Sequence, residues 1–383
     1  MTRRLRAVRV LLDVSAVPAR PAGAGLYTCE LARGLAGQSA VELHLAARRD
    51  DAGHWADLAP GATVHAEAPG PRPLRLGWEQ AGTARLAERV AADVWHGPHY
   101  TMPLRRPLPT VVTMHDLTFF DHPEWHERTK VSYFRRMIRA SAKRADAIVC
   151  ISEFTSSRLA AVAPARGPVT VARHGVDHER FRVDADPTAD RAILAARGIT
   201  EPYVAFVGTL EPRKDIPTLV DAFARLTVDH PELRLAIVGG DGWGADAVRS
   251  AIAGSGAATH IIRTGYVDDA VVPALHRRAV AVAYPSLEEG FGVPALEALA
   301  CGAPLVTTTG SALAEVAGDA ACTVAAGDVD GVAAALRRII DDPAYASELR
   351  RAGPEQARSF TWTRSVEQHV DVYERVVRAR CDA

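Results

Sequence analysis

Residues 285–297 have the sequence Pro-Ser-Leu-Glu-Glu-Gly-Phe-Gly-Val-Pro-Ala-Leu-Glu and directly follow an apolar run at 280–284. The run predicts a buried strand. Gly290 and Gly292 permit tight backbone geometry and close approach of a ligand, and Pro294 suits the first turn of a helix. The segment therefore predicts a strand–loop–helix unit whose helix N-terminus directs backbone N–H groups at a ligand beyond the strand.

The same alternation of short apolar runs and helical patterns extends along the whole chain. Near-continuous apolar strands separated by helices predict parallel sheets that are covered on both faces. Two such series in succession predict an α/β protein with two doubly wound domains. The expected strands are 7–14, 41–46, 93–95, 110–114, 147–151, 169–172, 203–207, 234–238, 260–263, 280–284 and 305–307.

The domain boundary is expected where this pattern lapses. Residues 183–200 contain several aspartates and no convincing strand, so we expect a linker there between an N-terminal domain at 1–182 and a C-terminal domain at 201–360. Residues 361–383 place apolar side chains at helical spacing, which predicts an amphipathic closing helix that packs back towards the N-terminal domain. Because ligands of open α/β sheets bind beyond the carboxyl ends of the strands, two facing domains predict a binding cleft between them.

Composition narrows the class of protein. A length of 383 residues suits two domains, and a formal net charge of −1 excludes a global field that would attract nucleic acid. The 5 cysteines are scattered, which favours buried thiols in a reducing cytosol over disulfides or a zinc site. We expect a cytoplasmic protein, because we find neither a signal-peptide pattern nor an apolar run of about 18 residues.

A second motif, Val-Gly-Thr-Leu-Glu-Pro-Arg-Lys-Asp at 207–215, follows the strand expected at 203–207. Arg213 and Lys214 are adjacent cations in a turn that leads into a helix, an arrangement that suits a diphosphate. Glu289 and Glu297 offer acceptor oxygens at two points of one elongated polar ligand. Alternatively, the two cations lie in a solvated turn. Glu289 would then be a solvated loop residue, and Glu297 would only interact favourably with the helix dipole.

Two weaker signals lie in the N-terminal half. Gly23 and Gly25 follow the first expected strand and let backbone N–H groups approach a phosphate, but Thr28 replaces the third glycine of a dinucleotide fingerprint. His115 ends the strand at 110–114, where it would face the cleft and bond a sugar hydroxyl. Alternatively, Gly23 and Gly25 only form a tight turn between a strand and a helix, and His115 is a structural histidine.

The segment Arg128–Arg144 carries seven basic and no acidic residues beside several apolar ones. This pattern suits an anionic lipid surface or an anionic acceptor, and a solvated helix is the alternative. Two Asp-x-Asp pairs, at 184–186 and 328–330, have the spacing of metal-bound nucleotide-sugar sites. The first lies in the expected linker and the second suits a helix cap, so we expect no essential metal.

Residues 206–215 and 285–298 resemble the donor-site motifs of retaining glycosyltransferases of family four, which have the GT-B fold. Residues 151–155, 174–177 and 315–318 also resemble stretches of that family. The resemblance implies two Rossmann-like domains facing an interdomain cleft, with the acceptor bound by the N-terminal domain at 1–182 and a nucleotide-sugar donor held by the C-terminal domain. It implies no cofactor, because the nucleotide sugar is a substrate.

The resemblance also assigns roles to residues of the C-terminal half. Glu289 would face the transferred sugar and Glu297 the donor ribose, and Arg213 and Lys214 would hold the diphosphate. Many relatives carry a third basic residue where this chain has Thr209, so the diphosphate would depend more on the other two cations. The remaining donor-binding residues implied on this side are Gly208, Thr209, Tyr266 and Val267 at the base, Gly290, Phe291, Gly292 and Val293.

In the N-terminal half, the resemblance makes Gly23 and Gly25 part of a loop that closes over the diphosphate, and His115 a neighbour of the donor sugar. The expected activity is transfer of a hexosyl unit, slightly favouring a GDP-mannose-like donor over a UDP-sugar, to a glycan, lipid or small-molecule hydroxyl. Contact with the inner face of an anionic membrane through Arg128–Arg144 is a further expectation. A nucleotide-sugar epimerase, a phosphorylase and a non-catalytic sugar-nucleotide sensor remain as alternatives.

Overall fold

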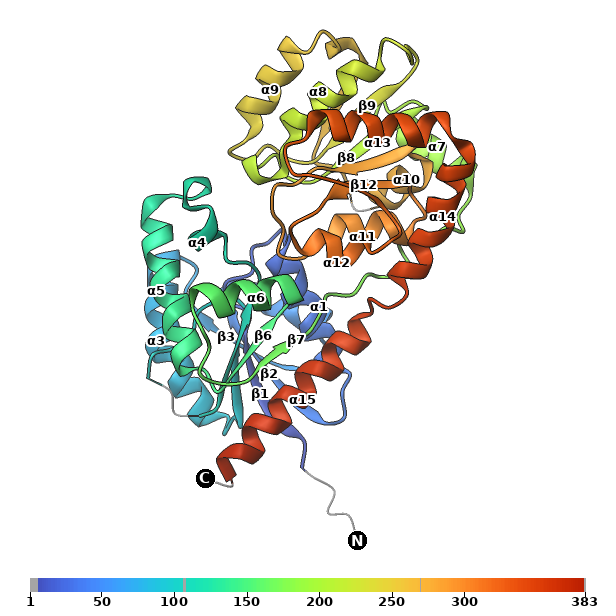
Figure 1. Ribbon diagram of the computed structural model, residues 1–383. Coiled ribbons are helices and arrows are strands. Elements are labelled where there is room, and N and C mark those ends of the chain that lie inside the picture. The colour runs from blue at the N-terminus through green and yellow to red at the C-terminus, as the bar shows by residue number, and fades with distance from the viewer. Residues whose placement is uncertain (1–5, 106–107, 269, 382–383) are drawn as a thin grey trace. The chain divides into compact units, whose positions relative to one another are not determined.

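The computed structural model describes residues 6–105, 108–268 and 270–381, and the chain divides into two compact units (Figure 1). The first unit comprises the chain up to Gly175 together with the segment from Trp362 onward, and the second comprises Val176–Thr361. Each unit is built around one parallel β-sheet, of 7 strands in the first and 6 in the second. The predicted α/β fold with two doubly wound domains is confirmed.

The sheet of the first unit has the order β3-β2-β1-β4-β5-β6-β7, and every strand pair is parallel. The direction of winding reverses between β1 and β4, so their carboxyl ends flank the crevice where ligands of such sheets bind. The strands are β1 (Val8–Asp13), β2 (Val41–Arg48), β3 (Thr63–Ala68), β4 (Val94–Gly97), β5 (Thr110–Met114), β6 (Ala147–Cys150) and β7 (Val169–Val171).

Seven α-helices and two short 3-10 helices accompany this sheet in the described residues. They are α1 (Ala24–Ala36), α2 (Ala52–Leu58), α3 (Arg72–Arg89), α4 (Thr118–Asp121), α5 (Arg128–Arg144), α6 (Glu153–Val162), α15 (Trp362–Cys381), η1 (Arg49–Asp51) and η2 (Pro123–Trp125).

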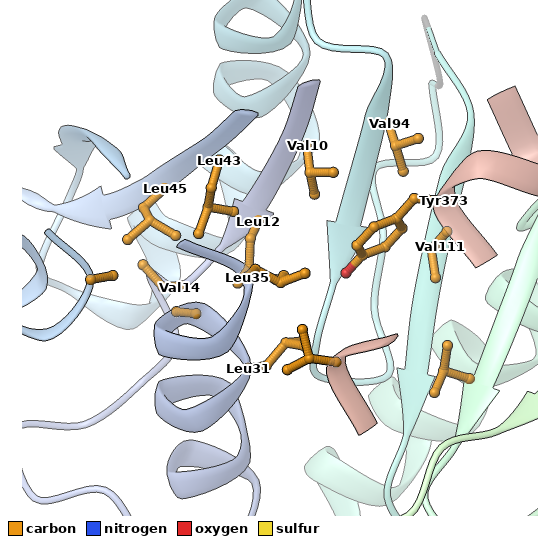
Figure 2. Packing of buried hydrophobic residues seen from close by; sticks show 14 of the residues in the cluster. Val10, Leu12, Val14, Leu31, Leu35, Leu43, Leu45, Val94, Val111 and Tyr373 are labelled. Atoms are coloured by element: carbon orange, nitrogen blue, oxygen red, sulfur yellow. The ribbon is translucent and has the colours of Figure 1, made fainter. Parts of the chain in front are cut away.

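The strands of the first unit are apolar on both faces because both faces are covered. Successive side chains of β1 point to opposite sides: Val10 and Leu12 pack in one cluster, and Leu11 packs in another with residues of α3 and α5. Figure 2 shows the first cluster, in which Leu35 of α1 and Tyr373 of α15 lie against the strands. Such double coverage produces the continuous apolar runs seen in the sequence.

The second unit has the strand order β10-β9-β8-β11-β12-β13, also entirely parallel, and its winding reverses between β8 and β11. Its strands are β8 (Tyr203–Val207), β9 (Arg234–Val238), β10 (Ile261–Gly265), β11 (Ala281–Tyr284), β12 (Leu305–Thr308) and β13 (Cys322–Val324). Its helices are α7 (Pro187–Ala195), α8 (Ile216–Leu226), α9 (Ala245–Gly254), α10 (Val271–Arg278), α11 (Val293–Ala300), α12 (Ala312–Ala317), α13 (Val329–Asp341), α14 (Pro343–Ala357), η3 (Pro212–Lys214) and η4 (Ala258–His260).

The stretch 183–200, expected to be a linker, instead contains α7 and belongs to the second unit. Two of its aspartates have structural partners. Asp186 caps the helix by accepting a hydrogen bond from Thr188 N at 2.8 Å, and Asp190 is buried against Arg277 of α10, which donates to it from Nε and Nη2 at 2.7 Å each. Asp186 and Asp190 therefore serve as a helix cap and as half of a buried ion pair within the second unit, not as linker residues.

The chain passes from the second unit back to the first at Trp362, where α15 begins. This helix packs chiefly on α1, and it also contacts β1, β4 and β6. Within the described part of the chain, no helix has the length and apolarity needed to cross a bilayer.

Candidate active site

Polar side chains of the second unit gather in the two loops that follow β8 and β11, the pair of strands at which the winding reverses. The loop after β8 runs through the 3-10 helix η3 to Asp215, which adopts the left-handed conformation at φ 47° before α8 begins. Leu287 of the second loop donates its N–H to the carbonyl of Arg213 at 2.8 Å. The backbone thus ties the two motifs together.

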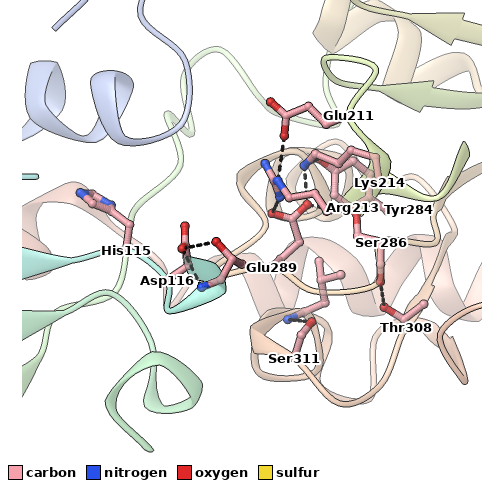
Figure 3. A network of polar contacts seen from close by, with 12 residues as sticks. His115, Asp116, Glu211, Arg213, Lys214, Tyr284, Ser286, Glu289, Thr308 and Ser311 are labelled. Atoms are coloured by element: carbon pink, nitrogen blue, oxygen red, sulfur yellow. Dashed lines mark hydrogen bonds and ion pairs between the residues drawn. The ribbon is translucent and has the colours of Figure 1, made fainter. Parts of the chain in front are cut away.

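Arg213, Lys214 and Glu289 form one charge cluster across these loops (Figure 3). Both cations donate to the Glu289 carboxylate. Arg213 also donates from Nε to Glu211 at 2.8 Å, and Ser286 donates to Glu289 Oε1 at 3.0 Å. Three of the predicted residues, the two cations and Glu289, are therefore brought together within hydrogen-bond range.

Burial and charge act against each other in this cluster. Burial alone would raise the pKa of Glu289, but the charges of Arg213 and Lys214 outweigh it and hold that pKa at about 2. Burial, followed by repulsion from Arg213, lowers the pKa of Lys214 to about 8. Burial opposes the charge on Arg213 too, yet Glu289 and Glu211 raise its pKa. At neutral pH the carboxylate and both cations are ionised.

The two cations differ in their access to solvent. The side chain of Arg213 is 27% exposed, whereas that of Lys214 is 7% exposed and donates to the Tyr284 hydroxyl at 2.6 Å. A guanidinium has five N–H groups in a planar fork, so Arg213 can bind an oxyanion while it keeps its carboxylate partners. Lys214, which is buried, donates to Glu289 and adds positive charge to the cluster without being exposed to solvent.

Backbone geometry at Gly292 explains the glycine in the second motif. Its φ is 100°, and a Cβ there would lie 2.5 Å from Leu313 Cδ2, so a larger residue fits neither the conformation nor the space. Gly292 is the N-cap of α11, Val293 is the first helical residue, and Pro294 lies in the first turn. The first N–H groups of a helix have no acceptor within it, which suits this end to bind phosphate or hydroxyl oxygens.

The other predicted donor-site residues lie at the same edge of this sheet. Gly208 and Thr209 begin the loop after β8, and Thr209 is exposed. Tyr266 and Val267 follow β10; Tyr266 is 59% exposed and Val267 is buried. Gly290 and Phe291 precede α11, with Phe291 buried in edge contact with Phe360, and Glu297 is half-buried in the middle of the helix.

The three candidates of the first unit lie at the carboxyl edge of the other sheet. Gly23 is the N-cap of α1, with φ 50°, and Gly25 lies inside α1, where a Cβ would approach Pro21 to 3.2 Å. His115 follows β5 and is buried, and its Nε2 donates to the carbonyl of Pro98 at 2.6 Å. Burial lowers the pKa of His115, so the ring is neutral and Nδ1 is the nitrogen with an acceptor lone pair.

Several polar partners were missed by the sequence analysis. Glu211, Tyr284 and Ser286 belong to the charge cluster through hydrogen bonds to Arg213, Lys214 and Glu289. Glu211 lies in the motif at 207–215 and Ser286 in the motif at 285–297. Their positions beside the predicted site residues could therefore have identified them as candidates. Tyr284 ends a buried strand and looked like a core residue, and only the fold brings its hydroxyl to Lys214.

Comparisons with known proteins agree with this fold. Residues 191–359 match the family model "Glycosyl transferases group 1", and residues 21–180 match "Glycosyltransferase Family 4". The chain is 31% identical to the O-antigen chain mannosyltransferase B of Escherichia coli, over 73% of this chain and 74% of that protein. It is 29% identical to a GDP-mannose-dependent alpha-(1-6)-phosphatidylinositol monomannoside mannosyltransferase of Mycolicibacterium smegmatis, over 70% of this chain and 72% of that protein.

Among solved structures, the sucrose-phosphate synthase of Thermosynechococcus elongatus resembles this chain with a TM-score of 0.80 at 20% sequence identity. The match covers 97% of this chain and 100% of that one. At this identity the likeness concerns the fold.

Proposed function

Because this chain belongs to glycosyltransferase family 4, we propose that it transfers a hexosyl unit, with retention of configuration, from a nucleotide-diphosphate sugar to a hydroxyl acceptor. The donor we favour is GDP-mannose, and a UDP-sugar is next. The observation that carries the proposal is the cluster of Arg213, Lys214 and Glu289 in the two loops that lead into α8 and α11.

Breaking the bond between the sugar and the diphosphate leaves negative charge on the departing phosphate. Preorganised cations and helix N-termini stabilise such charge without a metal. In our proposal Arg213 and the N-terminus of α11 bind the phosphate oxygens, Lys214 adds positive charge, and Glu289 fixes both cations. The acceptor oxygen forms its bond to the anomeric carbon on the face that the phosphate leaves, and the phosphate takes the acceptor proton.

The remaining residues have proposed binding roles. Tyr266 offers an exposed ring after β10 that is suited to stacking on a nucleobase. Val267, the next residue, is buried and would contribute to the same base site. Glu297 would accept from the ribose hydroxyls, and Gly208, Thr209 and residues 290–293 would bond phosphate and sugar. In the first unit, the loop at Gly23 and Gly25 would approach the diphosphate, and Nδ1 of His115 would accept from a sugar hydroxyl.

The preference for GDP-mannose is supported by two mannosyltransferase relatives, one of which is named as GDP-mannose-dependent. The test is cleavage of GDP-mannose and UDP-glucose, each labelled in the sugar, with and without a panel of hydroxyl acceptors and in the presence of EDTA. We expect GDP-mannose to be cleaved faster, acceptors to increase the rate, an α-configured product by NMR, and no loss of rate with EDTA. Interconversion of the donor without acceptor would instead indicate an epimerase, and a β-configured product would exclude retention.

We also propose that α5 contacts anionic lipid headgroups through its arginines. Met137 and Ile138 of this helix are buried in the core, so contact would be electrostatic rather than by insertion. Arg128, Arg136 and Arg139 line an open hollow of about 850 Å³. Cosedimentation with phosphatidylglycerol vesicles should exceed that with phosphatidylcholine vesicles and should fall with added salt, since exposed charges are screened. Equal binding to both lipids would contradict the proposal.

A further inference from the structure

Tyr100, in the loop that follows β4, has an unusual backbone conformation. Its φ is 62°, in the left-handed region, and in the described part of the chain only Ala91 and Asp215 share a positive φ without being glycine. A side chain disfavours this conformation because its Cβ crowds the backbone, whereas glycine adopts it readily. Asp215 directly follows the charge cluster of the second unit. Strained residues persist where the surrounding structure compensates for the strain, and they are concentrated at functional sites.

The backbone of Tyr100 is fixed by hydrogen bonds through both of its polar groups. Its N–H donates to the carbonyl of Thr113 in β5 at 3.0 Å, and its carbonyl accepts from the Ser141 hydroxyl of α5 at 2.8 Å. Two residues earlier in the same loop, the carbonyl of Pro98 accepts from His115 Nε2 at 2.6 Å. The strained backbone at Tyr100 and the position of the His115 ring are therefore parts of one arrangement.

The hydroxyl of Tyr100 binds the residue that follows His115. It donates to Asp116 Oδ2 at 2.8 Å. The other carboxylate oxygen, Oδ1, accepts from the N–H and from the hydroxyl of Thr118, at 3.1 and 2.7 Å. Both carboxylate oxygens of Asp116 (Figure 3) are therefore held, one by the loop after β4 and the other by the first turn of α4.

The ring of Tyr100 packs edge-on against three other rings. Its centroid lies 5.6 Å from that of His115, at an interplanar angle of 74°. It lies 6.1 Å from the ring of Phe119 in α4 and 5.8 Å from that of Phe134 in α5. Edge-to-face contacts at such distances are favourable. Phe119 and Phe134 are themselves stacked at 4.4 Å, so Tyr100 links His115 to a packed aromatic cluster.

These contacts act together on the state of the His115 ring. Donation from Nε2 to the carbonyl of Pro98 assigns the proton to that nitrogen, so Nδ1 carries the lone pair. An imidazole with one tautomer and one orientation accepts a hydrogen bond at a single defined point, and such preorganisation strengthens the contact with a substrate. A glycine at position 100 would suit the backbone but would supply neither the hydroxyl nor the ring. The side chain of Tyr100 is therefore the part that compensates for the strain.

From this geometry we propose that Tyr100 is a positioning residue for the sugar transfer. Its hydroxyl holds Asp116 and its ring holds His115, and together they fix the loop after β4 against the end of β5. The lone pair of His115 Nδ1 is thereby directed at a hydroxyl of the transferred sugar. The inference rests on the proposed function, because it takes that hydroxyl as the partner of Nδ1. Tyr100 acts through His115 and needs no contact of its own with the donor.

A double-mutant cycle with His115 tests the proposal on the full chain, with GDP-mannose labelled in the sugar as the probe. Tyr100→Phe, which removes only the hydroxyl, should lower kcat/KM about tenfold in the wild-type background and less than about twofold in a His115→Ala background. Tyr100→Gly, which suits the left-handed backbone but lacks the side chain, should lower it further in the wild-type background. The matched control is Tyr133→Phe, which should turn over like wild type. Tyr133 of α5 also packs on Phe134, and this variant loses the same atom.

Ring ¹⁵N NMR of histidine-labelled protein gives a readout that does not depend on turnover. The signals of His115 are identified as those that disappear in His115→Ala. In wild type they should show a single tautomer with the proton on Nε2. In Tyr100→Phe they should move towards the average of the two tautomers, whereas Tyr133→Phe should leave them unchanged. Circular dichroism of each variant separates loss of position from loss of the fold.

The proposal is overturned if Tyr100→Phe lowers kcat/KM equally in both backgrounds, or if the His115 signals keep the single-tautomer pattern in Tyr100→Phe and in Tyr100→Gly. Wild-type protein that cleaves GDP-mannose, while Tyr100→Phe changes neither readout, would refute the role of Tyr100 alone. If wild-type protein cleaves no donor but its His115 signals respond to Tyr100→Phe, the proposed function fails and the positioning of the ring is supported.

Discussion

Replacing Arg213 and Lys214 together with alanine is expected to lower kcat/KM for donor cleavage by roughly 10²–10³-fold, equivalent to about 2.7–4 kcal/mol, the usual cost of removing a preorganised stabiliser of transition-state charge. Arg213 is the more exposed of the two and Lys214 is buried beneath it. Loss of Arg213 should therefore act mainly on phosphate binding. Steady-state kinetics with the labelled donor measure the effect.

The same substitutions leave Glu289 buried without its cations, and an uncompensated buried charge destabilises a fold by several kcal/mol. Adding Glu289→Gln to the double variant removes that charge and should restore stability without restoring turnover. Arg225→Ala serves as the matched control. Arg225 is an exposed arginine on α8, the helix that follows η3, and it pairs with Asp330. Turnover of the stabilised triple variant at the wild-type level would exclude the proposed role of the cations.

The fold was predictable from sequence mainly where strands are covered on both faces. The apolar runs at β1, β8 and β11 correspond to buried strands. The two strands that were missed, β3 and β13, lie at sheet edges, and β3 consists of Thr-Val-His-Ala-Glu-Ala, without a continuous apolar run. An edge strand is half-solvated, and polar side chains there remove the signal on which the prediction depended.

The parts of the site that could be predicted from sequence are those in which the residues are close together along the chain. Arg213 with Lys214, and Glu289 with residues 290–293, stand in single motifs that follow strands. The pairing of Glu289 with both cations joins residues about 75 positions apart and follows from the order of strands in the sheet. Tyr100, by contrast, looked like an ordinary loop residue, because nothing in the neighbouring sequence indicates its left-handed backbone.

The first unit contains a further feature that no local pattern indicated, a buried cluster of histidines drawn from β4, α15 and the loops after β4, β5 and β7. His369 donates from Nδ1 to Ser365 O at 2.6 Å, so its Nε2 accepts from the Tyr27 hydroxyl at 2.7 Å. His96 is hydrogen-bonded to the hydroxyls of Tyr373 and Thr113, at 2.6 and 2.8 Å. Together with those of His99, His115 and His174, these rings lie in contact around Tyr27, with the His174 ring stacked on the tyrosine and the other pairs tilted or edge-on.

Burial keeps these histidines neutral. It lowers the pKa of His99 to about 3 and that of His369 to about 4, and it lowers the pKa values of His96 and His174 well below 6.5. Mutual repulsion among the rings adds to this for His96, His99 and His174. Asp116, which adjoins His115, acts in the opposite direction on that ring. The cluster as a whole resists protonation while the unit is folded.

The first unit is therefore expected to lose about 3 kcal/mol of its free energy of unfolding between pH 7 and pH 5.5. The histidines remove about 5 kcal/mol. Glu79, whose pKa burial raises to about 8, is protonated in the folded chain only and adds back about 2 kcal/mol. Below about pH 6.5 the unfolded chain protonates these histidines and the folded chain does not, so stability that is present above this pH is lost as pH falls. Each of the four strongly shifted histidines contributes about 1.2 kcal/mol over this interval.

Urea unfolding followed by tryptophan fluorescence at the two pH values measures this loss. The signal reports the first unit, because 5 of the 6 tryptophans belong to it. His369→Gln should reduce the loss by about the contribution of one histidine, roughly 1 kcal/mol, whereas His54→Gln, at an exposed position of the same unit, should leave it unchanged. A free energy of unfolding that differs by less than about 1 kcal/mol between the two pH values would mean that the cluster takes up protons without unfolding, and that its rings are open to solvent in the native state.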